Sequence, residues 1–374
     1  MSELHFPPNT YYSCTECGKC CSAPWRIQVD PPKAAQIRET EAYQSLTRKG
    51  YQPLAVLDEQ FELARREDGS CFFLRDDNLC QIHAEKGLEA KPAVCQLYPF
   101  LLVATPEGYY VSLQFTCPAV LSGDGGPITN HGESLAATVR AAPHFFPPDL
   151  VPGNKVTLTA KASTDFYSYL AFEERLLQTL DLHEDIVGIL LEGAASVIDG
   201  SWSSEPDPAT WQLWEALYQV FHLFFANSVA SMERKAEPDE RAEYAQCLLH
   251  GGQVRSELLK ADAPPYRPGA GVCQLTRNVI KRYVQNKIWG KNLLTGPSLA
   301  VRLLLLALSL EVLTYYYLAR KEQLGVRHFD LEILEWSFDL VETDFLLHDD
   351  LVMPLVEEWA RMGMEISEGQ NNPN

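Results

Sequence analysis

The sequence is short of basic residues. Its 374 residues include 31 Lys and Arg against 50 Asp and Glu, which gives a formal net charge of −19 at pH 7. A protein that neutralises nucleic-acid phosphates or docks on anionic lipid needs a basic surface. The charge balance therefore argues against a general nucleic-acid binder and against a peripheral protein of anionic membranes.

Targeting and membrane segments are also lacking. The start, 1–8, has neither the basic region nor the apolar region of a secretory signal. The longest apolar stretch, 299–318, is interrupted by Arg302 and Glu311, and charges at the centre of a bilayer are costly. We therefore expect a cytoplasmic protein with no membrane span. If Arg302 and Glu311 are buried they need partners, and we favour pairing with other helices over the lining of a ligand cavity.

Familiar catalytic motifs are missing as well. The chain has no Walker sequence, no Gly-x-Ser-x-Gly elbow and no His-Glu-x2-His motif. No Asp/Glu-x-Gly-x-Gly run follows a strand, so a Rossmann-type methyltransferase site is not visible.

The composition is that of a folded protein, with 46% apolar and 22% charged residues. The pattern changes along the chain and predicts an α+β protein. We expect a metal-organised, cysteine-rich module of short strands and helices at 1–120 and a proline- and glycine-rich boundary at 121–160. A mainly α-helical domain at 161–365 and a disordered polar tail at 366–374 complete the prediction.

Local signals predict individual elements. Asp30 as N-cap and Pro31 at the first helical position predict one helix that runs to about residue 49. In the same module we expect short strands at 61–64 and 71–74, and a hairpin from 100–104 and 109–115. Apolar residues at three- and four-residue steps predict helices at 166–180, 211–232, 274–289, 298–320 and 329–345.

Cysteine is scarce in the last two-thirds of the chain, which contain only Cys247 and Cys273. Eight others gather in the cysteine-rich module: Cys14, Cys17, Cys20, Cys21, Cys71, Cys80, Cys95 and Cys117. In a secreted domain this density would indicate disulfides, whereas in a reducing compartment it predicts metal ligation.

The spacing of the first cysteines suits a metal loop. Two residues separate Cys14 from Cys17 and Cys17 from Cys20, so a tight turn can point their sulfurs inward, and Gly18 supplies the backbone freedom that such a turn needs. Three sulfurs leave at least one ligand to come from elsewhere.

Later residues supply further candidates. Cys80 and His83 form a Cys-x2-His pair, which makes His83 a candidate ligand. Cys20 and Cys21 are adjacent, and because successive side chains diverge we expect them to serve different metals or roles. Thiolates suit iron, an iron–sulfur cluster and zinc, so these remain alternatives. Lys19 and Arg26 are candidates to offset thiolate charge.

These residues stand in motifs that resemble a known family, the bacterial cysteine-cluster proteins of the CxxCxxCC type (YkgJ-like). The resemblance covers about residues 11–120 and implies chelation of zinc or iron by the eight cysteines. The motifs that carry it are Cys14-x2-Cys17-Gly18-x-Cys20-Cys21, Cys71-Phe72-Phe73-Leu74, Leu79-Cys80-x-Ile82-His83, Lys91-Pro92-x2-Cys95-x2-Tyr98-Pro99-Phe100 and Cys117-Pro118.

A second resemblance reaches into the helical domain. Cys20-Cys21 followed by Trp25 and Ile27, and then Tyr283, Asn286-Lys287 and Lys291-Asn292-Leu293, are similar to flagellin lysine-N-methylases. This resemblance implies an S-adenosylmethionine-dependent methyltransferase whose substrates are lysines of a flagellin-like protein.

Two functional hypotheses follow. In the first, the metal centre is the functional site and the helical domain presents a substrate or partner. In the alternative, the protein is a non-enzymatic adaptor in which zinc only folds the first 120 residues and the helices bind a partner.

Overall fold

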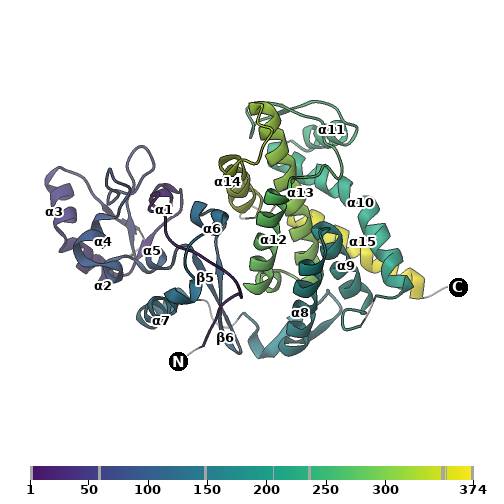
Figure 1. The fold of residues 1–374 in the computed structure, drawn as a ribbon, viewed down its shortest axis with the longest axis horizontal. Helices are drawn as coiled ribbons and strands as arrows, with labels where there is room; N and C mark the ends of the chain where they lie inside the picture. Colours follow the sequence, from purple (N-terminus) through teal and green to yellow (C-terminus); the bar gives the residue numbers. More distant parts are fainter. Residues whose placement is uncertain are drawn as a thin grey trace. The chain divides into compact units, whose positions relative to one another are not determined.

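Figure 1 shows a computed structural model of the chain, in which two compact units span 1–148 and 149–374. The structure describes residues 3–57, 60–146, 150–204, 206–234, 237–346, 350 and 352–371. As the sequence predicts, an amino-terminal region of short strands and helices precedes a mainly helical carboxyl-terminal region.

The first unit contains two small sheets. The predicted hairpin is confirmed: β5 (Phe100–Thr105) pairs antiparallel with β6 (Gly108–Leu113), and β1 (Leu4–His5) adds to β6 in parallel. The second sheet has the order β2-β4-β3, formed by β2 (Gln28–Val29), β3 (Leu54–Leu57) and β4 (Gln60–Leu63).

Short helices connect these strands. The α-helices of the first unit are α1 (Lys19–Ser22), α2 (Pro31–Arg38), α3 (Glu41–Arg48), α4 (Gln81–Lys86), α5 (Ala93–Leu97), α6 (Pro118–Ser122) and α7 (Gly132–Ala141). Three single 3-10 turns accompany them: η1 (Leu88–Ala90), η2 (Ile128–His131) and η3 (Pro143–Phe145).

The helix predicted from residue 31 to 49 is two helices. Asp30 caps α2 as expected, since its side chain accepts from Lys33 N at 2.8 Å. Thr40 then ends the run, because its buried hydroxyl accepts from Tyr43 N at 3.1 Å and caps a second helix, α3. Threonine at that position was a signal for a helix start that the sequence prediction overlooked.

The predicted strand at 71–74 is also wrong. Cys71 and Leu74 make only isolated bridges, to Arg65 and Cys80. A tight turn between them, with Leu74 N bonded to Cys71 O at 3.0 Å, prevents an extended ladder.

The structure corrects two of the predicted boundaries. The stretch 121–160 contains the end of α6 together with η2 and α7, because its glycines and prolines mark helix ends: Gly123 closes α6 with a positive φ of 72°. The stretch 366–371 belongs to α15 (Met353–Asn371), where Ser367 is buried, so these polar residues form part of an amphipathic helix. Residues 372–374 lie outside the described part of the chain.

The second unit is built from helices with two small hairpins. All five helices predicted from periodicity occur there, although the last continues from α14 into a π-helical turn, η6 (Leu340–Phe345). The helices are α8 (Phe166–Leu182), α9 (Ile186–Asp199), α10 (Pro208–Glu233), α11 (Pro238–Leu249), α12 (Gln274–Trp289), α13 (Leu299–Leu324), α14 (Leu331–Asp339) and α15. The remaining elements are η4 (Pro152–Asn154), β7 (Lys155–Thr157), β8 (Ser163–Asp165), β9 (Val254–Ser256), β10 (Ala261–Ala263) and η5 (Asn292–Leu294).

Helix α13 is the centre of this unit. It is long and apolar enough to span a bilayer, yet most of it is buried against other helices of the unit. Tyr315, Tyr316 and Tyr317 are all buried although they point in different directions. Burial on all sides is typical of a core helix.

A fully buried ion pair lies beside this core. Lys291 follows α12 and its ammonium contacts the carboxylate of Glu173 on α8, with neither side chain more than 5% exposed. Tyr169 donates a second hydrogen bond to Glu173 at 2.6 Å. Removal of one partner would leave the other charge buried and unpaired.

We predict that Lys291→Met lowers the free energy of unfolding of the helical unit by about 3–5 kcal/mol. The matched control is Lys161→Met in the exposed pair Lys161–Glu368, which should cost less than about 1 kcal/mol. Urea denaturation followed by far-ultraviolet circular dichroism measures both. An equal cost for the two variants would contradict the prediction.

Candidate metal centre

Thiols from four separate segments line one cavity of about 200 Å³ in the first unit. Most of the remaining wall is apolar or aromatic, and Lys91 is its charged member. The thiols that line the cavity belong to Cys20, Cys21, Cys71, Cys80 and Cys95. We refer to this site as the thiol cavity.

Helix α1 places the first two thiols. Gly18 precedes the helix with a φ of +75°, as the spacing of the cysteines predicts, and a Cβ there would lie 3.0 Å from the Cβ of Asn78. Cys20 and Cys21 then follow on one short helix. Adjacent residues on a helix are about 100° apart rather than on opposite faces, and Cys20 and Cys21 both line the same cavity. That they serve different metals or roles stays a prediction.

Backbone contacts fix the neighbouring segments against α1. Cys71 N donates to Cys21 O at 2.8 Å, and Arg65 donates to the same carbonyl at 3.3 Å and to Trp25 O at 2.6 Å. The indole of Trp25 donates to Cys20 O at 3.1 Å. These bonds hold Cys20, Cys21 and Cys71 close in space although 50 residues of sequence separate the last two.

The other two cysteines belong to short helices: Cys80 precedes α4 as its N-cap, and Cys95 lies within α5. Cys80 is the residue before α4, whose first amide, Gln81 N, donates to Phe73 O at 2.8 Å. Cys95 lies on α5, which faces two cavities: Val94 and Cys95 line the thiol cavity, whereas Ala93 and Gln96 line a groove of about 1230 Å³.

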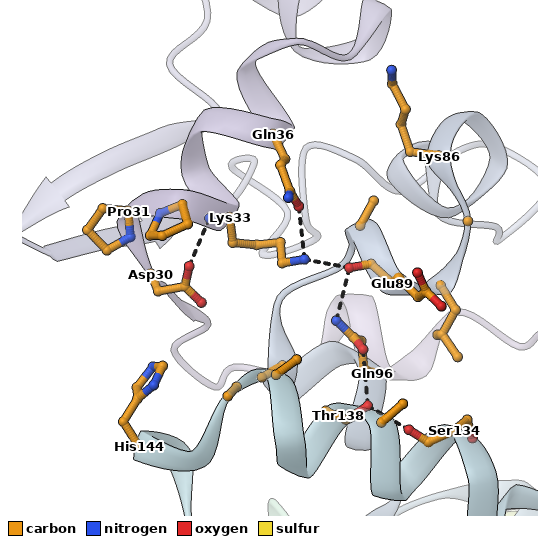
Figure 2. Close-up of a pocket in the computed structure, with 18 of the residues that line it drawn as sticks. Asp30, Pro31, Lys33, Gln36, Lys86, Glu89, Gln96, Ser134, Thr138 and His144 are labelled. Atoms are coloured by element: carbon orange, nitrogen blue, oxygen red, sulfur yellow. Dashed lines mark hydrogen bonds between the residues drawn. The ribbon is translucent and has the colours of Figure 1, made fainter.

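A row of hydrogen bonds between polar side chains and a backbone carbonyl in this groove holds α5 in place. Figure 2 shows Gln96 donating to Glu89 O at 3.2 Å and accepting from Thr138 at 3.1 Å, with Lys33 donating to the same Glu89 carbonyl. These contacts join α2, η1, α5 and α7. No cysteine lines the groove, so we assign it a supporting role: it holds the far side of the helix that carries Cys95.

The electrostatics of the thiols reflect their burial. A hydrogen bond from the Cys21 thiol lowers the pKa of Cys20 to about 6, burial opposes that shift and Lys91 adds to it. The same bond and burial raise the pKa of Cys21, and burial raises that of Cys71. Burial also raises the pKa of Cys95 to about 12. Burial thus dominates the pKa of Cys71 and Cys95, whereas the hydrogen bond between Cys20 and Cys21 dominates the pKa of those two thiols.

The remaining predicted cysteines form a second group outside the thiol cavity. Cys14 and Cys17 are exposed in the loop before α1, and Cys117 is buried at the start of α6. Cys14 and Cys17 lie near enough to Cys117 to contribute to its raised pKa, after burial, the main cause. After burial, the main cause, Cys117 and Cys20 both raise the pKa of Tyr98. Cys20 therefore lies near the second group as well as in the thiol cavity.

His83 is not among the residues that line the thiol cavity. It lies exposed on α4, outside the wall of the thiol cavity. Burial, followed by Lys91, lowers its pKa, and Glu16 opposes the change. Its role as a metal ligand stays a prediction without support from this geometry.

The basic residue at the cavity is Lys91, which the sequence argument missed. Arg26 is exposed and its guanidinium pairs with Glu62 at 3.5 Å instead. The signal for Lys91 was its place in the motif Lys91-Pro92-x2-Cys95. A cation at that point offsets negative charge on neighbouring thiolates.

The donor set of the thiol cavity fits zinc or iron, since both accept four thiolates. The side chains as they stand do not yet converge: in the part of the chain that the structure describes, no group of three or more His, Cys, Asp or Glu is placed to hold an ion. Binding therefore requires the thiols to turn inward within the cavity and to lose their protons.

Comparison with known proteins identifies the class of this domain. Residues 13–118 match the model of the CxxCxxCC family, described as "Putative zinc- or iron-chelating domain". The match confirms the resemblance found in the motifs: residues 13–118 of the amino-terminal unit are similar to this cysteine-cluster domain.

A search of individual proteins finds a similar sequence whose activity is not characterized. An uncharacterized protein of Methanocaldococcus jannaschii is 31% identical over 98 residues, which are 26% of this chain and 32% of that protein. The chain thus spans about a third of the relative that it matches. No solved structure matches the chain.

We predict that Cys95→Ser and His83→Ala differ sharply in metal binding. Loss of Cys95 removes a donor from the thiol cavity and should weaken zinc or iron binding by more than the roughly 10–100-fold typical of an outer partner. His83→Ala should leave the metal content unchanged. Elemental analysis of anaerobically purified protein measures this.

The matched control for that experiment is Cys247→Ser in the helical unit, whose thiol donates to Gln253 O at 3.5 Å. It should retain its metal. Loss of metal from His83→Ala to the same extent as from Cys95→Ser would show that the ligand set differs from the thiol cavity.

Proposed function

We propose that zinc or iron bound in the thiol cavity is the functional centre of the amino-terminal unit, in a protein of the cytoplasm. The observation that carries this proposal is that five thiols from four segments line one cavity. Thiolates are soft ligands that prefer these metals over hard cations. In a reducing compartment such thiols bind metal rather than pair as disulfides.

The number of thiols favours this reading over a purely structural zinc site. A closed tetrahedral zinc site uses four ligands, and the thiol cavity offers five. One thiol is therefore left for a further role, either as an exchangeable ligand or toward a second ion. The adaptor hypothesis, in which metal only folds the module, needs four of these thiols and does not account for the fifth.

Metal binding should also tie the segments of the module together. An ion held by Cys71, Cys80 and Cys95 with α1 joins parts of the chain that otherwise meet through short elements and few strands. The binding free energy of such an ion contributes directly to folding, and structural zinc in small domains supplies about 10–16 kcal/mol.

We predict that chelation of the metal under anaerobic, reducing conditions increases hydrogen exchange in α1, α4 and α5 and leaves α13 protected. Hydrogen–deuterium exchange with mass spectrometry on the full chain locates the change. The control is the double variant Cys71→Ser and Cys95→Ser, in which the chelator should cause no further increase. Unchanged exchange in α1, α4 and α5 after complete removal of metal would refute the proposal.

A finer proposal concerns catalysis. The resemblance to flagellin lysine-N-methylases supports an S-adenosylmethionine-dependent transfer of methyl groups to protein lysines. In the carboxyl-terminal motif of this resemblance, the side chains make contacts within the helical unit. Lys287 pairs with Glu342 at 2.8 Å, and Tyr283 donates to the same carboxylate. Lys291 pairs with Glu173. These three side chains position helices, so the groups that would bind the methyl donor lie elsewhere.

The methyltransferase proposal predicts that the metal-loaded protein binds S-adenosylmethionine with a dissociation constant in the range of about 1 μM to 1 mM that is common for enzyme substrates. Isothermal titration calorimetry measures this, with S-adenosylhomocysteine as a second ligand. Absence of binding to the metal-loaded protein would leave metal chelation intact and dismiss the methyltransferase.

A further inference from the structure

The helical unit contains a cavity that is independent of the thiol cavity. Its volume is about 370 Å³, and it lies between the loop 264–271 and one face of α13. The face of α13 presents residues at helical spacing: Glu311, Thr314, Tyr315, Leu318, Ala319 and Glu322. The loop contributes Tyr266 and Arg267.

Glu311 is the half-buried carboxylate of this cavity; Tyr266 hydrogen-bonds to it directly, and His222 hydrogen-bonds to Tyr266. Tyr266 donates its hydroxyl proton to Glu311 Oε1 at 2.7 Å, and His222 Nδ1 lies 2.8 Å from the same hydroxyl. The Tyr266 hydroxyl donates its proton to the carboxylate, so in its contact with His222 the hydroxyl oxygen accepts a hydrogen bond from Nδ1–H. Both donors therefore stabilise negative charge on Glu311.

The other oxygen of Glu311 is available. Within the described part of the chain, Oε2 of Glu311 makes no hydrogen bond and the carboxylate has no salt-bridge partner. Lys321, which also lines the cavity, lies over the ring of Tyr317 at 5.3 Å and donates to Arg327 O at 3.4 Å. Arg267 is exposed. Among the residues that the structure describes, neither of these two cations of the cavity wall forms a salt bridge with Glu311.

Aromatic rings flank this carboxylate. The rings of Tyr266 and Tyr315 lie 6.1 Å apart at an interplanar angle of 76°, so they present surfaces in two directions. Phe225 packs against Tyr266 at 4.2 Å and supports it from the core. A carboxylate beside tyrosine rings attracts an organic cation by ion pairing and by cation–π contact.

We propose that this cavity binds the ammonium group of a primary alkylamine, with Glu311 Oε2 accepting a hydrogen bond from the ammonium and Leu318 and Ala319 contacting the alkyl chain. The inference does not rest on the metal centre. Both charged residues of the apolar helix have partners: Arg302 donates to Asn292 at 2.9 Å and Glu311 accepts from Tyr266 at 2.7 Å. Glu311 in addition lines this cavity.

Titration of the full chain with n-butylammonium chloride, followed by saturation-transfer nuclear magnetic resonance, tests the site. Glu311→Gln keeps the shape of the side chain and removes its charge, so affinity should fall about tenfold or more, as for loss of a hydrogen bond to a charged group. n-Butanol, which has the same chain without the charge, should bind about tenfold more weakly or worse to the wild type.

The matched control is Glu322→Gln, an exposed carboxylate at the same cavity. It should change the affinity less than about twofold, because exposed charges are screened. Should Glu311→Gln fail to fold, as judged by circular dichroism, Tyr266→Phe retains the ring, removes the donor to Glu311 and should weaken binding severalfold.

Nα-Acetyl-lysine methylamide distinguishes two sources of the ammonium. Tighter binding of this ligand than of n-butylammonium supports a protein lysine, and the reverse order supports a small free amine. Both outcomes uphold the site. Equal affinity of wild type and Glu311→Gln for n-butylammonium, or of the wild type for n-butanol and n-butylammonium, would overturn it.

Discussion

The burial of thiols in an apolar cavity is the constraint on which the amino-terminal unit depends. Cys71, Cys80 and Cys95 come from distant segments, and their surroundings offer few polar partners. A thiol is a weak hydrogen-bond donor, so little is gained from gathering several in one place. Bonds to a soft cation compensate for that crowding and for the charge of the resulting thiolates. A sheet and short helices then need only bring the sulfurs within reach of one another.

The helical unit is organised on a different principle. Its core helix, α13, is buried on nearly all sides, and the fold can therefore accept a buried ion pair, Lys291 with Glu173, without losing its packing. Glu311 on the same helix accepts a hydrogen bond from Tyr266 and, among the described residues, forms no salt bridge. Soft sulfur donors line the cavity of one unit and a hard carboxylate lines that of the other, so the two proposed sites would select ligands of different chemistry.

Local signals predicted much of this fold. Asp30 before two prolines starts a helix, Gly18 adopts the left-handed conformation between cysteines, and the hairpin of β5 and β6 follows its turn residues. Helix α9 escaped prediction because its run of apolar and small residues has no clear helical period. The grouping of the cysteines and the pairing of Tyr266 with Glu311 depend on contacts between distant residues, which periodicity does not encode.

The central claim is that sulfur atoms of the thiol cavity bind zinc or iron. X-ray absorption spectroscopy at the edge of the bound metal tests it most directly, because it reports the type and distance of the ligand atoms. The account predicts a first shell dominated by sulfur at about 2.3 Å, with that shell diminished in a variant in which Cys71 and Cys95 are replaced by serine. A first shell of nitrogen and oxygen alone, unchanged in that variant, would contradict it.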